Sequence, residues 1–341
     1  MKPGRVYSDR GDRKRAAWPD HLCSAVGCGR IRHAPYGGIQ NSCRSIIRTM
    51  FKETLLLPDG SRMPRLGQGT WQMAEEDGKI EREVAGLRHG FDLGFRLIDS
   101  AEMYADGKSE LLVGKALQGY RREEQFIVTK VLPEHANRKR IYSSLDRSLA
   151  LLKTDYVDMY LLHWRGETDL SEMVACMEDL KERGKIRRWG VSNFDVCDME
   201  DLWRVPDGRN CCVNQILYNL GSRGVEYDLI PWQRERNIPF MAYCPVGQAG
   251  ALVTQDRVSK EKMVHDANVR AVADRHGCSI VQVLLAFVLR LEDFAAMPKA
   301  VGFDHIEENY AVKQISLTDE DIDQLSRSFP APMEKIPMEK Y

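Results

Sequence analysis

Short apolar runs alternate with longer stretches of helical spacing through most of this 341-residue chain. Runs such as FRLID (95–99) and FIVTK (126–130) have the length and composition of buried strands. Between such runs, KIEREVAGLRHGFDLG (79–94) spaces its apolar residues three or four positions apart, which is the spacing of one helix face. The alternation predicts parallel strands joined by helices.

The pattern repeats often enough to define a fold class. Eight strands are expected, at 65–69, 95–99, 126–130, 156–163, 188–192, 212–219, 240–246 and 294–299. Helices are expected at 79–94, at 109–120, at 170–185 with Gly184 as C-cap, and at 270–291 with a division near Gly277. Units of about 25–35 residues favour a single closed (β/α)8 TIM barrel of the α/β class. An open dinucleotide-binding sheet is disfavoured, because GQG at 67–69 lacks the third glycine of GxGxxG.

The chain before the first barrel strand has two parts. TLLL and RMPRL flank the turn sequence PDGS, which predicts a short β-hairpin. Residues 1–49 show no sustained helical or strand spacing of apolar residues, and they contain ten Lys and Arg against three Asp. We expect 1–49 to be a disordered or non-native leader and 50–341 to be the barrel domain. A targeting segment is an alternative for the leader, and so is a metal site, for which the candidate ligands are His21, Cys23, Cys28 and His33.

Composition indicates which classes of partner the chain is expected to bind. The formal net charge is −1 at pH 7, and no run of about 18 apolar residues occurs, so neither nucleic acid nor membrane is an expected partner. The nine cysteines include no CxxC pair, which suits reduced thiols and a cytoplasmic location. We expect a small-molecule substrate, no metal, and a monomer or weak oligomer.

Titratable side chains gather at the ends of three consecutive predicted strands. Asp99, Lys130 and His163 each end a strand, and Tyr104 follows Asp99 in the next loop. Active sites of (β/α)8 barrels are built at the carboxyl ends of the strands, so these four side chains are expected to meet. Each has an ordinary structural explanation alone, such as a helix cap or a buried core histidine, but four together favour catalysis.

The chemistry of this group suits a proton donor. A tyrosine has a pKa near 10, and a nearby lysine ammonium favours the phenolate and lowers that pKa. Asp99 is expected to hold Lys130 in its charged form, and neutral His163 to orient a carbonyl oxygen. One alternative is a lyase or isomerase with Lys130 as a Schiff-base nucleophile.

Several ordered motifs together resemble the aldo-keto reductases over about residues 52–330. They are LGQGTW, IDSAEMYADGKSE, VTK, DYVDMYLLHW, GKIRRWGVSNF, NQILYN, YCPVGQAG and MPKA. LLHWRGE and LGSRGVEYDLIPW are similar to small bacterial methylglyoxal and aldehyde reductases. The resemblance implies an oxidoreductase acting on CH-OH groups, which moves hydride between NADPH and an aldehyde or ketone, with NADH as the alternative cofactor. A non-turnover, cofactor-sensing regulatory subunit of the same fold is the alternative function.

The resemblance also implies residue roles. Tyr104 is the implied proton donor, with Asp99, Lys130 and His163 as its catalytic partners, and the implied substrate contacts are Trp71, Tyr104, His163 and Trp164. The implied cofactor contacts are Thr70, Asp99, Ser192, Asn193, Gln215, Tyr243, Cys244, Pro245, Val246, Lys299, Ala300, His305, Glu308 and Asn309. Cys244 and Ala300 stand where the family often has serine, and His305 where it often has arginine, so the clamp on a 2′-phosphate is incomplete.

Overall fold

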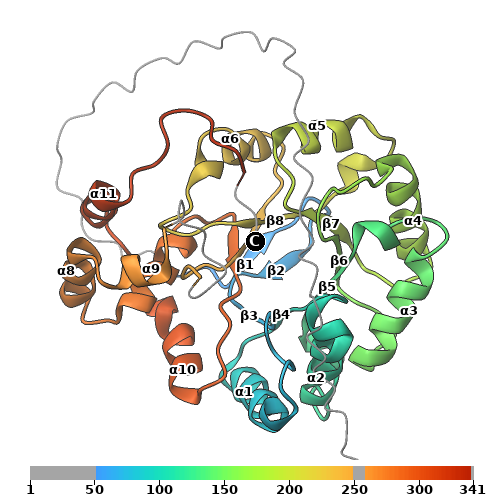
Figure 1. The fold of residues 1–341 in the computed structure, drawn as a ribbon, viewed down its shortest axis with the longest axis horizontal. Helices are drawn as coiled ribbons and strands as arrows, with labels where there is room; N and C mark the ends of the chain where they lie inside the picture. The colour runs from blue at the N-terminus through green and yellow to red at the C-terminus, as the bar shows by residue number, and fades with distance from the viewer. Residues whose placement is uncertain (1–50, 249–257, 339–341) are drawn as a thin grey trace, which may run out of the picture. The chain divides into compact units, whose positions relative to one another are not determined.

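A computed structural model describes residues 51–248 and 258–338. These residues form a ring of helices around a central sheet, which Figure 1 views along the barrel axis. The predicted leader, residues 1–49, lies outside the described residues. Its boundary with the barrel domain therefore stays a prediction.

Eight parallel strands make the central sheet, in chain order from β3 to β10. An isolated bridge between Leu66 and Ala296 joins the first strand region to the last, so the sheet closes into a barrel. This confirms the (β/α)8 prediction. The strands are β3 (Gly67–Gly69), β4 (Leu97–Asp99), β5 (Phe126–Val131), β6 (Met159–Leu162), β7 (Trp189–Ser192), β8 (Asn214–Leu217), β9 (Phe240–Tyr243) and β10 (Phe294–Ala296).

Helices surround the barrel. They are α1 (Ile80–Leu93), α2 (Lys108–Ala116), α3 (Ile141–Leu152), α4 (Leu170–Glu182), α5 (Val196–Arg204), α6 (Leu229–Arg234), α7 (Lys260–Val264), α8 (Ala267–His276), α9 (Ile280–Leu289), α10 (Phe303–Ala311) and α11 (Asp319–Ser328). Among the described residues, no single helix is long and apolar enough to cross a membrane; α8 and α9 meet that test only as a pair bent by 88°.

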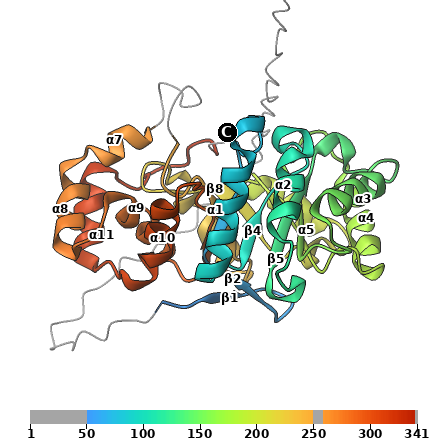
Figure 2. The same ribbon diagram turned by 90° about the horizontal axis from the view of Figure 1, so that it is seen from below.

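Two apolar cores hold the barrel together. The larger core lies between strands and helices, and includes outward-facing Ile127 and Val131 of β5. The smaller core fills the barrel, where Leu97 and Val128 meet residues of the N-terminal hairpin, such as Met63. That hairpin, β1 (Thr54–Leu56) and β2 (Arg62–Pro64), lies at the lower end of the barrel in Figure 2. The hairpin therefore closes the end at which the strands begin.

The predicted elements are present, with changes at their ends. Seven of the eight strands are shorter than their predicted runs, because sheet pairing stops where the loops diverge, and β5 extends one residue beyond its predicted run, to Val131. The division at Gly277 is confirmed, since this residue has φ 59° between α8 and α9. The predicted C-cap of α4, Gly184, is one residue too late: the C-cap is Arg183. Gly184 is the next residue and has a left-handed φ of 71°. Six helices, α3, α5, α6, α7, α10 and α11, fall outside the specifically predicted ranges.

Candidate active site

Inward-facing positions change from apolar to polar along the strands. Side chains alternate between the two faces of a strand, so every second residue points into the barrel. In β4 this series runs from Leu97 to Asp99, and in β5 from Val128 to Lys130. After β6 it reaches His163, two positions beyond Leu161. The barrel interior is thus apolar at the hairpin end and polar at the carboxyl end.

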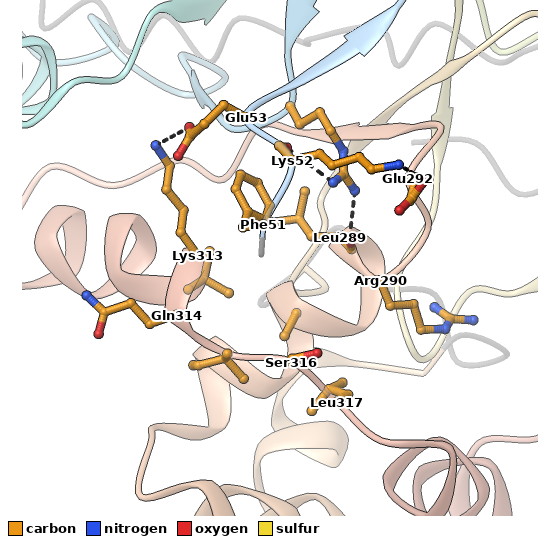
Figure 3. Close-up of a pocket in the computed structure, with 14 residues that line it drawn as sticks. Phe51, Lys52, Glu53, Leu289, Arg290, Glu292, Lys313, Gln314, Ser316 and Leu317 are labelled. Atoms are coloured by element: carbon orange, nitrogen blue, oxygen red, sulfur yellow. Dashed lines mark hydrogen bonds and ion pairs between the residues drawn. The ribbon is translucent and has the colours of Figure 1, made fainter. Parts of the chain in front are cut away.

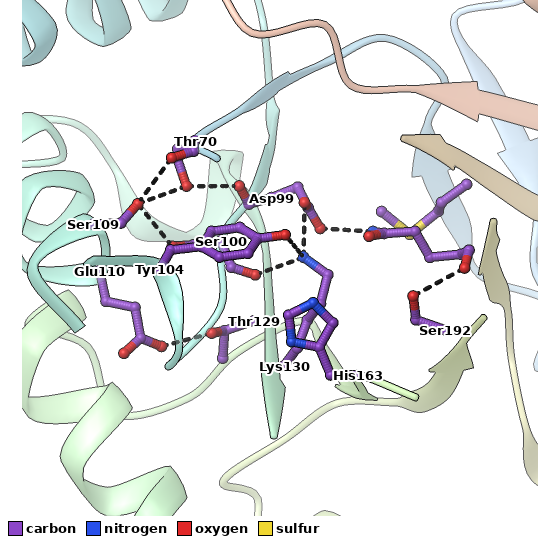
Figure 4. A network of polar contacts seen from close by, with 12 residues as sticks. Thr70, Asp99, Ser100, Tyr104, Ser109, Glu110, Thr129, Lys130, His163 and Ser192 are labelled. Carbon is purple, nitrogen blue, oxygen red and sulfur yellow. Dashed lines mark hydrogen bonds and ion pairs between the residues drawn. The ribbon is translucent and has the colours of Figure 1, made fainter. Parts of the chain in front are cut away.

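Lys130 is the centre of the polar end. Its ammonium donates hydrogen bonds to the Asp99 Oδ2 at 2.8 Å, the Ser100 carbonyl at 2.8 Å and the Tyr104 hydroxyl at 3.1 Å. Figure 4 shows these three contacts converging on the lysine nitrogen. The side chain of Lys130 is fully buried, so all three donors are satisfied within the protein. The predicted meeting of Asp99, Tyr104 and Lys130 is therefore present in the structure.

The pKa of Tyr104 is shifted in the direction opposite to the one expected from the sequence. The pKa of Tyr104 lies well above its ordinary value, because burial disfavours the phenolate and the Asp99 carboxylate adds to the effect. We predicted a lowered pKa, and this was wrong because burial of the phenol, with a further contribution from the Asp99 carboxylate, raises it. Burial also lowers the pKa of Lys130, an effect that Asp99 opposes. The phenol is consequently protonated at neutral pH, as a proton donor must be.

His163 and two tryptophans, Trp71 and Trp164, line the space beside the phenol. Burial, and secondarily the charge of Lys130, holds the pKa of His163 well below its usual value, so the ring is neutral. The His163 ring centroid lies 5.7 Å from that of Tyr104 and 5.1 Å from that of Trp164. Trp71 packs edge-on against Tyr104 at 4.8 Å. The four predicted substrate contacts, Trp71, Tyr104, His163 and Trp164, are therefore neighbours.

The chain follows an unusual path just after Tyr104. In the 3-10 segment η2 (Tyr104–Gly107), Ala105 has φ 48°, Asp106 has φ 52° and Gly107 has φ 84°. A left-handed conformation costs a residue with a side chain about 1–2 kcal/mol, whereas glycine adopts it readily. Tyr104 is thus joined to α2 by a turn in which two consecutive residues other than glycine are strained.

Side chains from β7, β8 and β9 extend the polar network away from the phenol. The Gln215 amide donates to Asp99 Oδ1 at 2.7 Å, and the Ser192 hydroxyl donates to the Gln215 carbonyl at 2.9 Å. Tyr243 donates its hydroxyl proton to Asn193 Oδ1 at 2.8 Å. Asn193 has φ 59°, which turns its amide back onto the His163 carbonyl at 3.1 Å. Four predicted cofactor contacts therefore lie beside the catalytic group.

The remaining predicted cofactor contacts lie at the same end of the barrel. Thr70 follows β3 and donates to the Asp99 carbonyl at 2.9 Å. The Cys244 thiol donates to Gln248 Oε1 at 3.4 Å. The others lie in the segment after β9 (Cys244, Pro245 and Val246), the segment after β10 (Lys299 and Ala300), and α10 (His305, Glu308 and Asn309).

Sequence reasoning missed two buried serines that tie these loops together. The Ser109 hydroxyl, in the first turn of α2, donates to Thr70 Oγ1 at 2.8 Å. The Ser100 hydroxyl donates to Ser109 Oγ at 3.4 Å, and its backbone carbonyl accepts from Lys130. Ser109 is the next-to-last residue of IDSAEMYADGKSE. Because serine is common at helix starts, its presence there did not indicate a role in the site.

A cavity of about 700 Å³ lies on the hairpin side of the barrel, near the start of β3 and β10. Figure 3 shows that two of its lysines face two of its glutamates. Lys52 pairs with Glu292 at 2.5 Å, and Lys313 pairs with Glu53 at 2.6 Å. None of the predicted site residues lines this cavity, which separates it from the candidate active site.

Comparison with known proteins agrees with the geometry of the site. The profile of the aldo/keto reductase family matches residues 65–328. Methylglyoxal reductase YeaE of Escherichia coli (strain K12) is 46% identical over 277 residues, which cover 81% of this chain and 95% of that protein. A glyoxal reductase of Bacillus subtilis (strain 168) is 29% identical over 279 residues, covering 81% and 93%.

A solved structure shows the same architecture. An aldo-keto reductase from Klebsiella pneumoniae, in complex with NADPH, superposes with a TM-score of 0.80 at 44% identity, covering 86% of this chain and 100% of that one. These matches make the chain an NAD(P)H-dependent oxidoreductase. This chain belongs to the aldo/keto reductase family. The predicted family, fold and enzyme class are confirmed.

Proposed function

We propose that this protein reduces small aldehydes and ketones, methylglyoxal-like carbonyls among them, to alcohols with NADPH, and that Tyr104 is the proton donor. The observation that carries the proposal is the buried contact of the Lys130 ammonium with the Tyr104 hydroxyl at 3.1 Å, at the carboxyl end of the barrel. The methylglyoxal and glyoxal reductases similar to this chain support the substrate class.

The geometry accounts for the proton transfer. Lys130 donates to the phenol oxygen, so the proton of the Tyr104 hydroxyl is not used in that contact. It can pass to a carbonyl oxygen placed between Tyr104 and neutral His163. The phenolate that remains is stabilised by the ammonium, which Asp99 holds in place. Because this charge appears only as the carbonyl is reduced, its stabilisation lowers the barrier.

The residues present fit a nicotinamide cofactor. Ser192, Asn193 and Gln215 offer hydroxyl and amide groups suited to a carboxamide, and the ring of Tyr243 is beside them. When bound, reduced nicotinamide supplies the hydride. The buried Nδ1 of His163 has no hydrogen-bond partner among the described residues, so this ring retains hydrogen-bonding capacity in the site.

Steady-state kinetics test the proposal. Oxidation of NADPH and of NADH is followed with methylglyoxal, glyceraldehyde, a nitrobenzaldehyde and a simple ketone as substrates. We expect turnover with the aldehydes and a higher kcat/KM with NADPH. Tight NADPH binding without turnover on any carbonyl would contradict the proposal and favour the cofactor-sensing alternative. Borohydride trapping of a substrate on Lys130 would favour the Schiff-base alternative instead.

A further inference from the structure

The strained turn after Tyr104 is held from outside the barrel. Arg147 of α3 donates from its Nη2 to the Asp106 carbonyl at 3.0 Å and to Asp106 Oδ1 at 3.3 Å. The main contact is with the backbone, so it fixes the path of the chain and not just a side chain. Arg147 is the residue that reaches this carbonyl, although it lies 41 positions away in the sequence.

The two ends of the turn are already fixed. Before it, the Tyr104 N–H donates to the Ala101 carbonyl at 3.0 Å, and Lys130 holds the phenol. After it, Ser109 binds Thr70. Between these anchors the backbone must remain left-handed at Ala105 and Asp106, a conformation that these residues disfavour. Relaxation of the turn would move the residue next to it, which is Tyr104.

We propose that Arg147 is a positioning residue for Tyr104, and that it acts by holding Ala105 and Asp106 in the left-handed conformation. The proposed role of Arg147 is exerted through the turn and involves no contact with substrate or cofactor. The packing at Gly107 supports the same route: a Cβ there would meet Leu151 Cδ1 at 2.8 Å and Arg147 Nη2 at 3.4 Å, so α3 contacts two successive residues of the turn. The inference rests on the proposed role of Tyr104 as proton donor.

Arg147→Met removes the donors and keeps the aliphatic stem. We expect kcat for methylglyoxal to fall about tenfold, because displacement of a catalytic group by about 1 Å can cost up to about 100-fold. The Kd for NADPH, measured by quenching of protein fluorescence, should change less than about twofold. The deuterium isotope effect on kcat with 4-deuterated NADPH should rise, because the chemical step becomes slower than product release.

Arg204→Met is the matched control. Arg204 is an exposed arginine whose ion pairs with Glu200 and Asp201 stay within α5. This variant should leave kcat and the isotope effect unchanged. Equal kinetics for Arg147→Met and Arg204→Met would overturn the inference, and so would a drop in turnover explained by weaker NADPH binding.

A second variant tests the strain itself. Ala105→Gly lowers the cost of the left-handed conformation, so the turn should keep its path without Arg147. Adding Arg147→Met to Ala105→Gly should therefore reduce kcat less than about twofold. A tenfold loss in both backgrounds would show that the turn does not carry the effect. Tyr104→Phe separates the two proposals: if it retains turnover, the proposed proton donor is wrong, and if it abolishes turnover while Arg147→Met has no effect, only this inference fails.

Discussion

Two lysine–carboxylate pairs at opposite ends of the barrel differ sharply in burial. At the carboxyl end, Lys130 is fully buried and is bound by Asp99, whose side chain is 6% exposed. At the hairpin end, Lys52 and Glu292 pair with 57% of each side chain exposed. Exposed pairs contribute about 0–1 kcal/mol, whereas a buried pair depends on both of its members. Burial, and not residue type, therefore determines how much the loss of one partner of such a pair affects stability.

The backbone shows the same contrast. At the carboxyl end, left-handed residues other than glycine lie beside site side chains: Gln72 follows Trp71, Ala105 follows Tyr104, and Cys244 follows Tyr243. Elsewhere, Lys153 takes that conformation as the C-cap of α3, where left-handed residues commonly end helices. Strain at the carboxyl end is thus associated with the placement of particular side chains.

The largest effect is expected from breaking the buried pair. Lys130→Met should lower the free energy of unfolding by about 3–5 kcal/mol, because the Asp99 carboxylate is left buried without its partner. Lys52→Met, at the exposed end, should change it by less than about 1 kcal/mol. Urea denaturation measures both. Similar losses in the two variants would contradict the contrast between the ends.

Removal of the phenol hydroxyl should affect the chemical step far more than cofactor binding. Tyr104→Phe should lower kcat by at least about 100-fold, the low end for a general acid, while the Kd for NADPH is retained. The control is Tyr227→Phe, which changes an exposed tyrosine. Stopped-flow measurement of NADPH oxidation tests the prediction, and unchanged turnover in Tyr104→Phe would refute the assignment.

Lys299 should govern the choice of cofactor. Lys299→Met should reduce the ratio of kcat/KM for NADPH to that for NADH about tenfold, because a charge-assisted contact with the 2′-phosphate is lost. His305 is 77% exposed and lies 3.4 Å from Glu308, so His305→Arg should increase the ratio by adding a two-bond phosphate ligand. Lys313→Met, at the hairpin end, should leave it unchanged. An unaltered ratio in Lys299→Met would exclude this lysine as the phosphate ligand.

Glycine should relieve backbone strain at a left-handed residue beside the site and also at one that caps a helix. Ala105→Gly and Lys153→Gly should each stabilise the protein by about 0.5–1 kcal/mol, because each residue has a positive φ in the folded state. Lys153→Gly should leave kcat unchanged, since this residue only ends a helix. Thermal unfolding and steady-state rates check both statements; a lower Tm in either variant would show that its conformation is not strained.

The smallest effect is expected from pH. The raised pKa of Tyr104 keeps the donor protonated as pH rises, so activity is lost only when pH rises through that value. The lowered pKa of His163 keeps it neutral until pH falls through that lower value. Reduction should therefore vary less than about threefold between about pH 6 and pH 9. A steep change in kcat/KM for an aldehyde between about pH 6 and pH 9 would contradict the raised pKa of Tyr104 or the lowered pKa of His163.

Much of the site could be predicted because strand ends are local features. The apolar run before Asp99 and the run before Lys130 show both the strand and its last inward-facing residue. The direction of the Tyr104 pKa shift could not be predicted, since it depends on how deeply the phenol is buried and on how close the Asp99 carboxylate lies. Arg147 could not be found either, because nothing in the spacing of α3 indicates which carbonyl its side chain reaches.

The amino-acid sequence by itself determined the alternation of strands and helices, the closed barrel, and the four side chains that would meet at one end. These follow from periodicity and from the rule that parallel strands present their carboxyl ends together. Only the tertiary structure decided the left-handed turn after Tyr104, the links through Ser109 and Arg147, and the protonation of the phenol. Such properties depend on burial and on contacts between residues far apart in the chain, which local patterns do not encode.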